Sequence, residues 1–450
     1  MTHDPVTSGP AVPVPPRSAQ PLRILYVTPS YPPKIGGGER YAEVIAQMAA
    51  QAGHQVTVLT SDVATNVDFW QWHPHADSLQ PTVEHAGGVT VIRYPAVGLP
   101  GAWTSLTLWR KAMVMLGALG RWTEPALCWM SRQIPHMPGL ERVLQEQAPW
   151  DLVHGYNLSW EYPLVIGAQL ARQHDIPLII TPFAHLGANV SARVTRNITM
   201  PHQLSMLHQA EAVLALPVAE AEGLVALGLS PDVVHAVGSG YDPAPDDLAQ
   251  VPLPEGLHAP VVAFVGRISL DKGAITAAQA VLALDGASAP APTLALMGPL
   301  DASFDRYYRT LDERQRRRIV LLGPVSEAVK HVVLEAAEML VLPSRVDSFG
   351  IVFLEAWAHG KPVIGARAGG IPGVIDDGVD GLLVPWGDAR ALSEAMQFLL
   401  RDPSLAFRLG AAGRQKTASR FTWQAVYANT ERIYQQVWQA HLAQHEETAP

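Results

Sequence analysis

Residues 346–370 read VDSFGIVFLEAWAHGKPVIGARAGG, a stretch that combines a turn, an apolar helix, a strand and a glycine loop. Asp347 stands in the turn, and Glu355 lies inside the helix with apolar neighbours on both sides. A carboxylate among apolar side chains is costly to bury unless another group hydrogen-bonds to it. Neighbouring hydroxyls of a sugar would serve, because a carboxylate can accept two hydrogen bonds at once. The alternative is a solvent-facing Glu355 and an Asp347 that only complements the helix dipole.

Short apolar runs alternate with helical patterns on both sides of this stretch. Seven runs lie before residue 245 and five after it, namely 22–28, 54–61, 89–95, 151–156, 177–182, 212–217 and 233–240, then 260–266, 293–298, 319–325, 339–344 and 361–367. Nearly unbroken runs of Val, Ile and Leu, each leading towards a helix, are typical of strands buried on both faces of a parallel sheet. The predicted fold class is therefore α/β, with two doubly wound, Rossmann-like domains.

The domain boundaries are predicted from composition. Residues 241–260, YDPAPDDLAQVPLPEGLHAP, are rich in proline and acidic residues and show little periodicity. We therefore predict an N-terminal domain over 22–245, a C-terminal domain over 246–420 and a closing helix within 421–450. Residues 1–21 are rich in proline and lack the apolar core of a signal peptide, which predicts a disordered tail. Ligands of such sheets bind beyond the carboxyl ends of the strands, so we expect the site in the cleft between the domains.

The overall composition excludes several classes of protein. Of the 450 residues, 48% are hydrophobic and 16% are charged, which describes a packed globular protein. The net charge of −9 argues against a general nucleic-acid-binding protein. Cys128 is the single cysteine, so no intramolecular disulfide can form, and a reducing, cytoplasmic location is expected.

The segment 103–122 contains a conspicuously apolar stretch, the nine residues 112–120. A helix that spans a bilayer needs about 20 apolar residues, so this stretch is too short to cross one. Its flanks combine tryptophan with cationic residues, as in helices that lie on a membrane surface; they are Trp109, Arg110, Lys111, Arg121 and Trp122. Peripheral contact with the inner face of a membrane through 103–122 is one interpretation, and packing inside the first domain is the alternative.

The loop GRISLDKG follows the predicted strand 260–266 and leads into a helix. Arg267 and Lys272 lie five residues apart in this loop. Two cations and a helix N-terminus beyond a sheet edge suit the binding of a diphosphate. The alternative is an ion pair between Arg267 and Asp271 at the surface, which would contribute less than about 1 kcal/mol.

Two glycine-rich turns follow strands. Gly36, Gly37 and Gly38 join the first strand to the first helix, and Gly369 and Gly370 follow the strand 361–367. Glycine lets a ligand approach the backbone and leaves amides free to point at an anion. A tight strand-to-helix connection would also need glycine, so a purely structural role is the alternative.

Histidines near strand ends are further candidates. His185 follows the strand that ends near residue 181, where its side chain could hydrogen-bond a sugar hydroxyl or support developing charge. His154 lies at the end of another strand and is a candidate on the acceptor side. His73 and His75 could bind a metal, but the sequence His-Pro-His without nearby Cys or carboxylate ligands is poor evidence for a metal site.

The order of these motifs resembles the retaining glycosyltransferases of family 4, which have the GT-B fold. In that family two glutamates separated by seven residues form the nucleotide-sugar signature, and Asp347 stands in place of the first of them. Gly373 stands where the family usually has Glu after Pro. The resemblance implies two domains that face an interdomain cleft and a C-terminal helix that crosses back to the first domain.

The resemblance also implies roles for the residues that match the family's motifs. The residues expected at the catalytic centre are Asp347, His185, Arg267 and Lys272. The residues expected to contact the donor are Gly37, Gly38, Arg267, Lys272, Phe349, Gly350, Glu355, Gly369, Gly370 and Ile371.

The implied activity moves a sugar, with retained anomeric configuration, from a nucleoside-diphosphate donor to a glycan, glycolipid or small-molecule acceptor. No permanently bound cofactor and no metal are expected, because fixed cations can stabilise the leaving diphosphate. Two alternatives stay open: a nucleotide-sugar epimerase or phosphorylase of the same fold, and a non-catalytic partner subunit that binds a nucleotide sugar. The shorter carboxylate of Asp347 and the presence of Gly373 support the second alternative.

Overall fold

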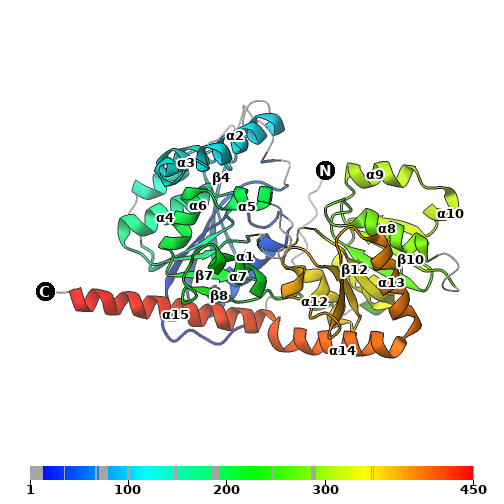
Figure 1. Ribbon diagram of the computed structural model, residues 1–450. Coiled ribbons are helices and arrows are strands. Elements are labelled where there is room, and N and C mark those ends of the chain that lie inside the picture. The colour runs from blue at the N-terminus through cyan, green and yellow to red at the C-terminus, as the bar shows by residue number, and fades with distance from the viewer. Residues whose placement is uncertain are drawn as a thin grey trace, which may run out of the picture.

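The computed structural model describes residues 14–34, 36–65, 68–69, 80–98, 102–145, 149–184, 186, 192–245, 248–284, 290–345, 347 and 349–448. These residues form two α/β domains that lie side by side, each built around one sheet (Figure 1). The predicted fold class is confirmed. The predicted boundary between residues 245 and 246 falls in the connection between the two sheets. The exact position of the boundary stays a prediction.

The first sheet has the strand order β3-β4-β2-β1-β5-β6-β7-β8. Its strands are β1 (Arg23–Val27), β2 (Gln55–Ser61), β3 (Thr82–Ala86), β4 (Val89–Tyr94), β5 (Leu152–Tyr156), β6 (Leu178–Thr181), β7 (Ala212–Ala215) and β8 (Val234–Ala236). Neighbours are parallel except at one edge, where β3 and β4 form an antiparallel pair. All residues of β3 are exposed, so no apolar run marked this strand in the sequence.

The second sheet has the order β11-β10-β9-β12-β13-β14, and all its recorded strand pairs are parallel. Its strands are β9 (Val261–Val265), β10 (Thr293–Met297), β11 (Ile319–Gly323), β12 (Ala337–Leu342), β13 (Val363–Ala366) and β14 (Gly381–Val384). Strands β9, β12 and β13 are therefore neighbours at the centre of the sheet. Their carboxyl ends lie at the same edge, which is the edge where such sheets bind ligands.

Helices cover the faces of both sheets. Those of the first domain are α1 (Gly37–Gln51), α2 (Ala102–Gly117), α3 (Glu124–Ser131), α4 (Tyr162–His174), α5 (Ala192–Ile198), α6 (Pro201–Gln209) and α7 (Val218–Ala226). Those that follow are α8 (Ala274–Ala283), α9 (Ala302–Arg309), α10 (Glu313–Arg316), α11 (Glu327–Ala336), α12 (Ile351–Ala358), α13 (Ala389–Arg401), α14 (Pro403–Arg420) and α15 (Trp423–Thr448). Short 3-10 turns occupy η1 (Arg121–Thr123), η2 (Leu140–Gln145), η3 (Leu248–Gln250) and η4 (Ile371–Gly373).

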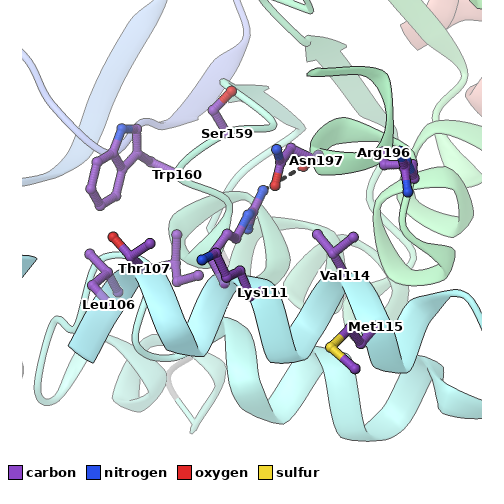
Figure 2. A pocket seen from close by; sticks show the side chains of 11 residues that line it. Leu106, Thr107, Lys111, Val114, Met115, Ser159, Trp160, Arg196 and Asn197 are labelled. Atoms are coloured by element: carbon purple, nitrogen blue, oxygen red, sulfur yellow. Dashed lines mark hydrogen bonds between the residues drawn. The ribbon is translucent and has the colours of Figure 1, made fainter. Parts of the chain in front are cut away.

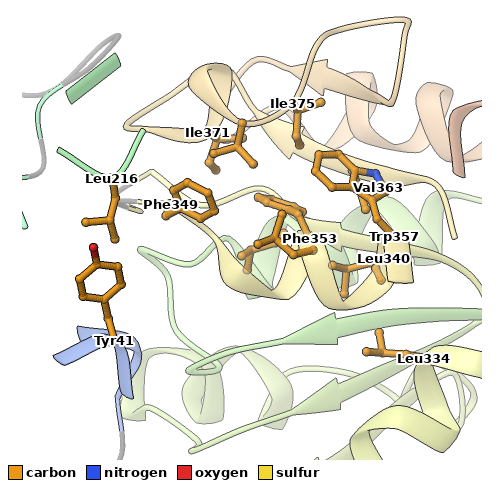
Figure 3. Close-up of a cluster of buried hydrophobic side chains, with 14 of the residues drawn as sticks. Tyr41, Leu216, Leu334, Leu340, Phe349, Phe353, Trp357, Val363, Ile371 and Ile375 are labelled. Atoms are coloured by element: carbon orange, nitrogen blue, oxygen red, sulfur yellow. The ribbon is translucent and has the colours of Figure 1, made fainter. Parts of the chain in front are cut away.

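Helix α1 shows why these segments are helical and how they are held. Tyr41, Val44, Ile45 and Met48 recur at helical spacing and are fully buried. This stripe belongs to a hydrophobic core that continues into the second domain. Figure 3 follows that core from Tyr41 and Leu216 in the first domain to the side chains of the second, such as Phe349.

The last two helices join the domains. Helix α14 lies along the second domain, and α15 runs beneath the first (Figure 1). The Tyr434 hydroxyl of α15 lies 2.9 Å from the Tyr26 hydroxyl of β1 and 2.7 Å from His154 Nδ1 of β5. The predicted crossing of the C-terminal helix back to the first domain is confirmed.

Helix α15 also holds part of the segment that was predicted to be a tail. The Gln435 side chain donates hydrogen bonds to Ser18 Oγ and to the Gln20 carbonyl oxygen, both at 3.0 Å. Residues 18–20 therefore lie against α15.

Candidate functional site

Three loops meet at the carboxyl ends of β9, β12 and β13 in the second domain. The loop after β9 carries Arg267 and Lys272, the loop after β12 carries Asp347, and the loop after β13 carries Gly369 and Gly370. Because the three strands are neighbours, residues almost a hundred positions apart are brought to one point. The predicted association of the GRISLDKG loop with the acidic turn is thus present in the fold.

An ion pair links the first two loops. Lys272 Nζ donates to Asp347 Oδ2 at 2.7 Å, and both side chains are largely buried. Gly273 makes this approach possible: it has φ +78°, and a Cβ at this position would lie 2.2 Å from the Pro343 carbonyl oxygen. Only glycine avoids that clash, so the close approach of Lys272 to the loop after β12 depends on Gly273.

The third loop packs onto the backbone of Asp347. The Gly370 amide donates to the Asp347 carbonyl oxygen at 2.8 Å. Gly369 has φ +59°, and a Cβ there would lie 2.9 Å from the same oxygen. The glycine loop thus fixes the backbone that presents the Asp347 carboxylate, and the Gly370 amide is already engaged in doing so.

Arg267 lies at the exposed side of this group. Among the described residues it forms no ion pair, and Asp271, the partner considered from the sequence, pairs with Arg345 at 2.8 Å instead. The pKa of Asp301 is lowered mainly by hydrogen bonds from Ser303, and the charge of Arg267 adds to that effect. Arg267 therefore lies near the N-terminus of α9, with its guanidinium available to an anion.

Glu355 is buried, so the solvent-facing alternative is wrong. Its Oε1 accepts a hydrogen bond from Lys330 Nζ at 2.7 Å, and its Oε2 is buried without a hydrogen-bond partner. Burial raises the pKa of Glu355, although the charge of Lys330 opposes the shift. A ligand hydroxyl that donated to Oε2 would satisfy the remaining oxygen.

Lys330 is a residue of this site that was not singled out from the sequence. It lies on α11 at helical spacing from the buried Val333 and Leu334, and its ammonium group bridges Glu355 and Glu327. A lysine on the buried stripe of a helix needs a partner. That pattern could have been recognised in the sequence, although the partner could not.

Two residues predicted to contact the donor have side chains in the core. The Phe349 ring is buried and packs edge-on against Phe421, with 5.4 Å between the ring centroids. Ile371 is fully buried in η4. Gly350 has φ +77° at the N-terminus of α12. Any contact of Phe349 or Ile371 with a ligand would therefore come from the backbone.

The first domain touches this site through its glycine-rich turn. A Cβ at Gly37 would lie 3.4 Å from Ile351 Cδ1, in the first turn of α12. A Cβ at Gly38 would lie 3.3 Å from the ring of Phe183, which follows β6. The turn after β1 and the start of α12 therefore face each other across the domain boundary.

A second contact between the domains involves Gly373. A Cβ at this position would lie 3.1 Å from both Cβ and N of Ala219 at the start of α7. A glutamate side chain, as the resembling family usually has here, would not fit in this arrangement without movement. The departure from the family's pattern is therefore matched by the packing of η4 against α7.

The side chain of Glu39 covers the glycine-rich turn of the first domain. A Cβ at Gly36 would lie 2.1 Å from Glu39 Oε2. Glu39 pairs with the buried Lys34 and accepts a hydrogen bond from Ser30 Oγ at 2.6 Å. An anion at the N-terminus of α1 is thus supplied by Glu39. A donor phosphate would have to displace that carboxylate.

The predicted histidines differ in their outcome. His185, His73 and His75 lie outside the described residues. His154 is fully buried, with Nδ1 at 2.7 Å from the Tyr434 hydroxyl and Nε2 at 2.8 Å from Thr181 Oγ1. Burial lowers the pKa of His154 to about 3. Its suggested role on the acceptor side is therefore wrong, and it instead connects β5 to β6 and α15.

Glu220 was also missed by the sequence analysis. It is fully buried on α7, and its two oxygens accept hydrogen bonds from the amides of Ala184 and Leu216. Burial raises the pKa of Glu220 to about 8, and the two amide hydrogen bonds oppose that shift. The residue ties the segment just before His185 to the end of β7. Nothing in the sequence of α7, VAEAEGLVA, distinguishes it from the exposed Glu222.

A group that could ligate a metal occurs elsewhere in the part of the chain that the structure describes. Asp175, His441 and His445 offer ligand atoms within 4.8 Å of one another, near the end of α4 and on α15. The group is largely exposed and lies on the first domain, away from Lys272 and Asp347.

A pocket of about 460 Å³ lies at the carboxyl edge of the first sheet (Figure 2). It is formed between α2, the turn after β5 and α5. Its apolar wall includes Leu106, Val114 and Trp160, and three cationic residues also line it. They are Arg110, Lys111 and Arg196. Arg110 donates to Glu161 Oε1 and to the Asn197 carbonyl oxygen, both at 2.5 Å.

None of the cavities recorded for the described residues is lined by Lys272, Asp347 or Glu355. The two domains approach each other closely at Gly37 and Ile351, at the start of α12. The convergence of charged side chains, and not cavity size, identifies the site.

Comparisons with known proteins agree with the fold. The family described as "Glycosyl transferases group 1" matches residues 259–402, and "Glycosyl transferase 4-like domain" matches residues 36–240. The fold is similar to the solved structure of Anabaena Alr3699/HepE in complex with UDP-glucose, with a TM-score of 0.63 and 19% sequence identity. The alignment covers 92% of this chain and 100% of that protein. The fold is thus that of a GT-B protein with two Rossmann-like domains.

Similar sequences define the family. D-inositol 3-phosphate glycosyltransferase of Corynebacterium glutamicum is 31% identical over 64% of this chain and 73% of its own length. Alpha-maltose-1-phosphate synthase of Mycolicibacterium smegmatis is 32% identical over 46% of this chain, and the match spans 58% of that enzyme. The chain belongs to the group 1 glycosyltransferases, and the predicted nucleotide-sugar-dependent glycosyl transfer is confirmed at that level.

Proposed function

We propose that the protein is a retaining glycosyltransferase that moves a sugar from a nucleoside-diphosphate donor to an acceptor held by the first domain. The observation that carries the proposal is the meeting of Arg267, Lys272 and Asp347 at two adjacent strand ends, with the unpartnered oxygen of Glu355 on the following helix. The group offers cations for a diphosphate and an acceptor for a hydroxyl. The retained configuration is proposed from the resemblance to family 4.

The donor half of the reaction follows from the charges. Breaking the bond between the sugar C1 and its phosphate oxygen leaves negative charge on the diphosphate, which Arg267 and Lys272 can stabilise. The acceptor oxygen then forms the new bond to C1, and its proton passes to the departing phosphate. Lys272 exchanges part of its pairing with Asp347 for the phosphate, so Asp347 is left beside the transferred sugar.

Glu355 is proposed to bind the ribose of the donor. Its Oε1 is fixed by Lys330, which leaves Oε2 for a hydroxyl. The neighbour HepE was solved with UDP-glucose, which supports a uridine nucleotide as the first donor to test. Of the roles predicted from the sequence, those of Arg267, Lys272, Asp347 and Glu355 are thus kept as proposals.

The pocket of Figure 2 is the proposed acceptor site. Lys111 and Arg196 suit a phosphate or another anionic group, and Leu106, Val114 and Trp160 suit an apolar or sugar surface. The relative named D-inositol 3-phosphate glycosyltransferase is consistent with a phosphorylated acceptor. A glycolipid or a glycan intermediate with an anionic group would also fit this combination. The single Cys128 supports a cytoplasmic location.

A ligand screen followed by product analysis tests the proposal. Thermal shifts would be recorded with UDP, GDP, ADP and their common sugars, and the best donor would then be incubated with candidate acceptors. The expected product carries the donor's anomeric configuration in its proton NMR coupling, and turnover persists in excess EDTA. Inversion of configuration, or activity that EDTA abolishes and magnesium restores, would contradict the proposal. Epimerised donor without acceptor, or donor binding without any transfer, would support the two alternatives instead.

A further inference from the structure

Helix α2 carries apolar side chains on two opposite sides. Leu106 and Met113 lie on its inner side, where they form a small core with Leu127 of α3 and residues Ile134 and Met200. Packing inside the first domain therefore accounts for this side of the helix. The same helix should be polar on its outer side if it only covered the domain.

The outer side of α2 is apolar as well. Five large side chains between residues 108 and 129 are each at least 60% exposed, namely Leu108, Met115, Leu119, Trp122 and Trp129. Together these five side chains form the α2–α3 face. Single exposed apolar residues are ordinary, but a cluster of this size on one surface marks a site of interaction.

The α2–α3 face is continuous across its two helices. The rings of Trp109 and Trp129 lie 6.1 Å apart, and Trp109 Nε1 donates to the Met130 carbonyl oxygen at 2.9 Å. Trp122 Nε1 donates to the Leu119 carbonyl oxygen at 2.9 Å, which fixes an otherwise exposed ring. Figure 1 places α2 and α3 at the end of the first domain that is opposite α15.

The charge around this face is opposite to that of the whole chain. Residues 102–138 contain four arginine or lysine residues and one acidic residue, Glu124, whereas the chain has a net charge of −9. The four cations are Arg110, Lys111, Arg121 and Arg132. Lys111, Arg121 and Arg132 are exposed beside the apolar side chains. A partner that fits this combination presents an apolar interior beneath an anionic surface.

We propose that the α2–α3 face docks on the surface of a bilayer that contains anionic lipids, with α2 lying in the plane of the interface. Tryptophan favours the boundary between headgroups and acyl chains, and Leu108, Met115 and Leu119 would enter the acyl region. Each exposed cation near an anionic surface adds attraction that salt screens. Among the described residues no helix is long and apolar enough to cross a membrane, so α2 would lie on the bilayer.

The proposal concerns a surface and does not depend on transferase activity. It has one consequence that rests on the proposed function. Lys111 and Met115 belong both to the outer side of α2 and to the pocket of Figure 2. A lipid-linked acceptor would therefore reach the pocket along the same helix that contacts the membrane.

Vesicle flotation with a matched pair of variants tests the docking. The test variant is Arg121→Glu/Trp122→Ser on the α2–α3 face, and the control is Phe407→Ser/Arg408→Glu on α14. Both variants change one exposed arginine and one adjacent aromatic residue that is more than 70% exposed. The vesicles are phosphatidylcholine alone, or phosphatidylcholine mixed equally with phosphatidylglycerol. Circular dichroism and the midpoint of urea unfolding report whether each variant is folded.

The wild-type protein and the control variant are expected to float with the phosphatidylglycerol vesicles and to be released by high salt. The test variant should partition at least about tenfold less, with its circular dichroism spectrum and unfolding midpoint unchanged. Equal binding of the two variants, or no binding of the wild type at low salt, would overturn the proposal. So would light scattering that showed a wild-type dimer dissociated by Arg121→Glu/Trp122→Ser, because a second copy would then cover the face.

Discussion

The loops of the second domain and helix α2 of the first domain hold their charged and apolar residues in opposite ways. In the second domain, Lys272 pairs with Asp347 and Lys330 pairs with Glu355, and these four side chains are largely or fully buried. On α2, Lys111 is exposed beside apolar side chains that are exposed as well. The first region is preorganised by the protein itself, whereas the second lacks a partner for its surface.

This difference fits the different tasks proposed for the two regions, which are stabilisation of charge in the reaction and contact with a partner surface. Charged groups that must meet developing charge are most effective when the protein holds them in place before the reaction. A surface that meets a membrane or a variable acceptor keeps its apolar and cationic groups exposed until that partner arrives.

Replacing a lysine by methionine should have unequal consequences in the two regions. Lys330→Met leaves the Glu355 carboxylate buried without its cation, which should lower the free energy of unfolding by about 3 to 5 kcal/mol. Lys111→Met should change it by less than about 0.5 kcal/mol, because the side chain is exposed. Urea unfolding of both variants provides the measurement. The double variant Lys330→Met/Glu355→Leu should recover most of the lost free energy of unfolding. Equal effects of the two single variants would contradict the difference between the two regions.

The two carboxylates of the second domain should differ in kinetics. Asp347→Asn should lower kcat about a hundredfold with little change in donor affinity, because charge develops near this residue as the sugar leaves. Glu355→Gln should mainly raise the donor KM, by about tenfold, since a hydroxyl contact is present in the ground state and the transition state alike. Steady-state kinetics of both variants with the same donor distinguish these roles. Wild-type values in both would mean that neither carboxylate belongs to the site.

Asp347→Glu restores the family's usual residue and sharpens the interpretation. A loss of activity or a change in sugar preference would show that the shorter side chain suits this enzyme's donor. A gain in activity would instead indicate partial decay of the site.

The attachment of α15 to the first domain should depend on pH through Glu431. Burial opposes its ionisation, but hydrogen bonds from His54 and Tyr427 outweigh that effect and lower the pKa of Glu431 to about 2. His54 Nδ1 accepts the Leu22 amide, so Nε2 carries the proton that it donates to Glu431. Because the pKa of Glu431 is lower in the folded protein than its ordinary value of 4.5, its ionised carboxylate stabilises the fold above about pH 4.5. This contribution to the free energy of unfolding is lost as the pH falls towards 2.

Glu431→Gln should therefore lower the free energy of unfolding by about 1.5 kcal/mol at pH 7. The difference from the wild-type protein should shrink as the pH falls from about 4.5 towards 2, as measured by denaturant unfolding at several pH values. Glu394→Gln, at an exposed pair with Arg390, is the matched control and should have no measurable effect. A difference that stays constant with pH would contradict the assignment.

Much of the fold could be predicted from the sequence, because a strand buried on both faces leaves a nearly continuous apolar run. The edge strand β3 could not, since all its residues are exposed and its pairing depends on β4. Strand β14 was also missed, as GLLV is too short a run to stand out. The strands that hold the site were therefore found, and one edge strand of each sheet was not.

The site was predictable to the extent that local spacing determines it. Arg267, Lys272, Asp347 and Glu355 follow strands in a recognisable order, and the structure brings Lys272 and Asp347 together. The partner of Glu355 was not predictable, because Lys330 lies on another helix and pairs only through tertiary packing.

Local sequence was least informative about burial. His154 looked accessible at a strand end, yet in the core it contacts the hydroxyl groups of Thr181 and Tyr434 from other elements, and that of Tyr156 on its own strand. For α2, the sequence left core packing and membrane contact open. The structure places one apolar side inward and one outward.

Calorimetric titration measures whether the second domain binds the nucleotide of the donor. UDP is the ligand, or another nucleoside diphosphate if the ligand screen favours one. Arg267→Ala and Lys272→Ala should each weaken binding roughly tenfold to a hundredfold, because charge-assisted hydrogen bonds to phosphate contribute about 1.5 to 3 kcal/mol apiece. Lys111→Ala, a cation of the first domain, should bind the nucleotide as tightly as the wild-type protein. Unchanged affinity in both Arg267→Ala and Lys272→Ala would contradict the assignment of the donor site to the second domain's three loops.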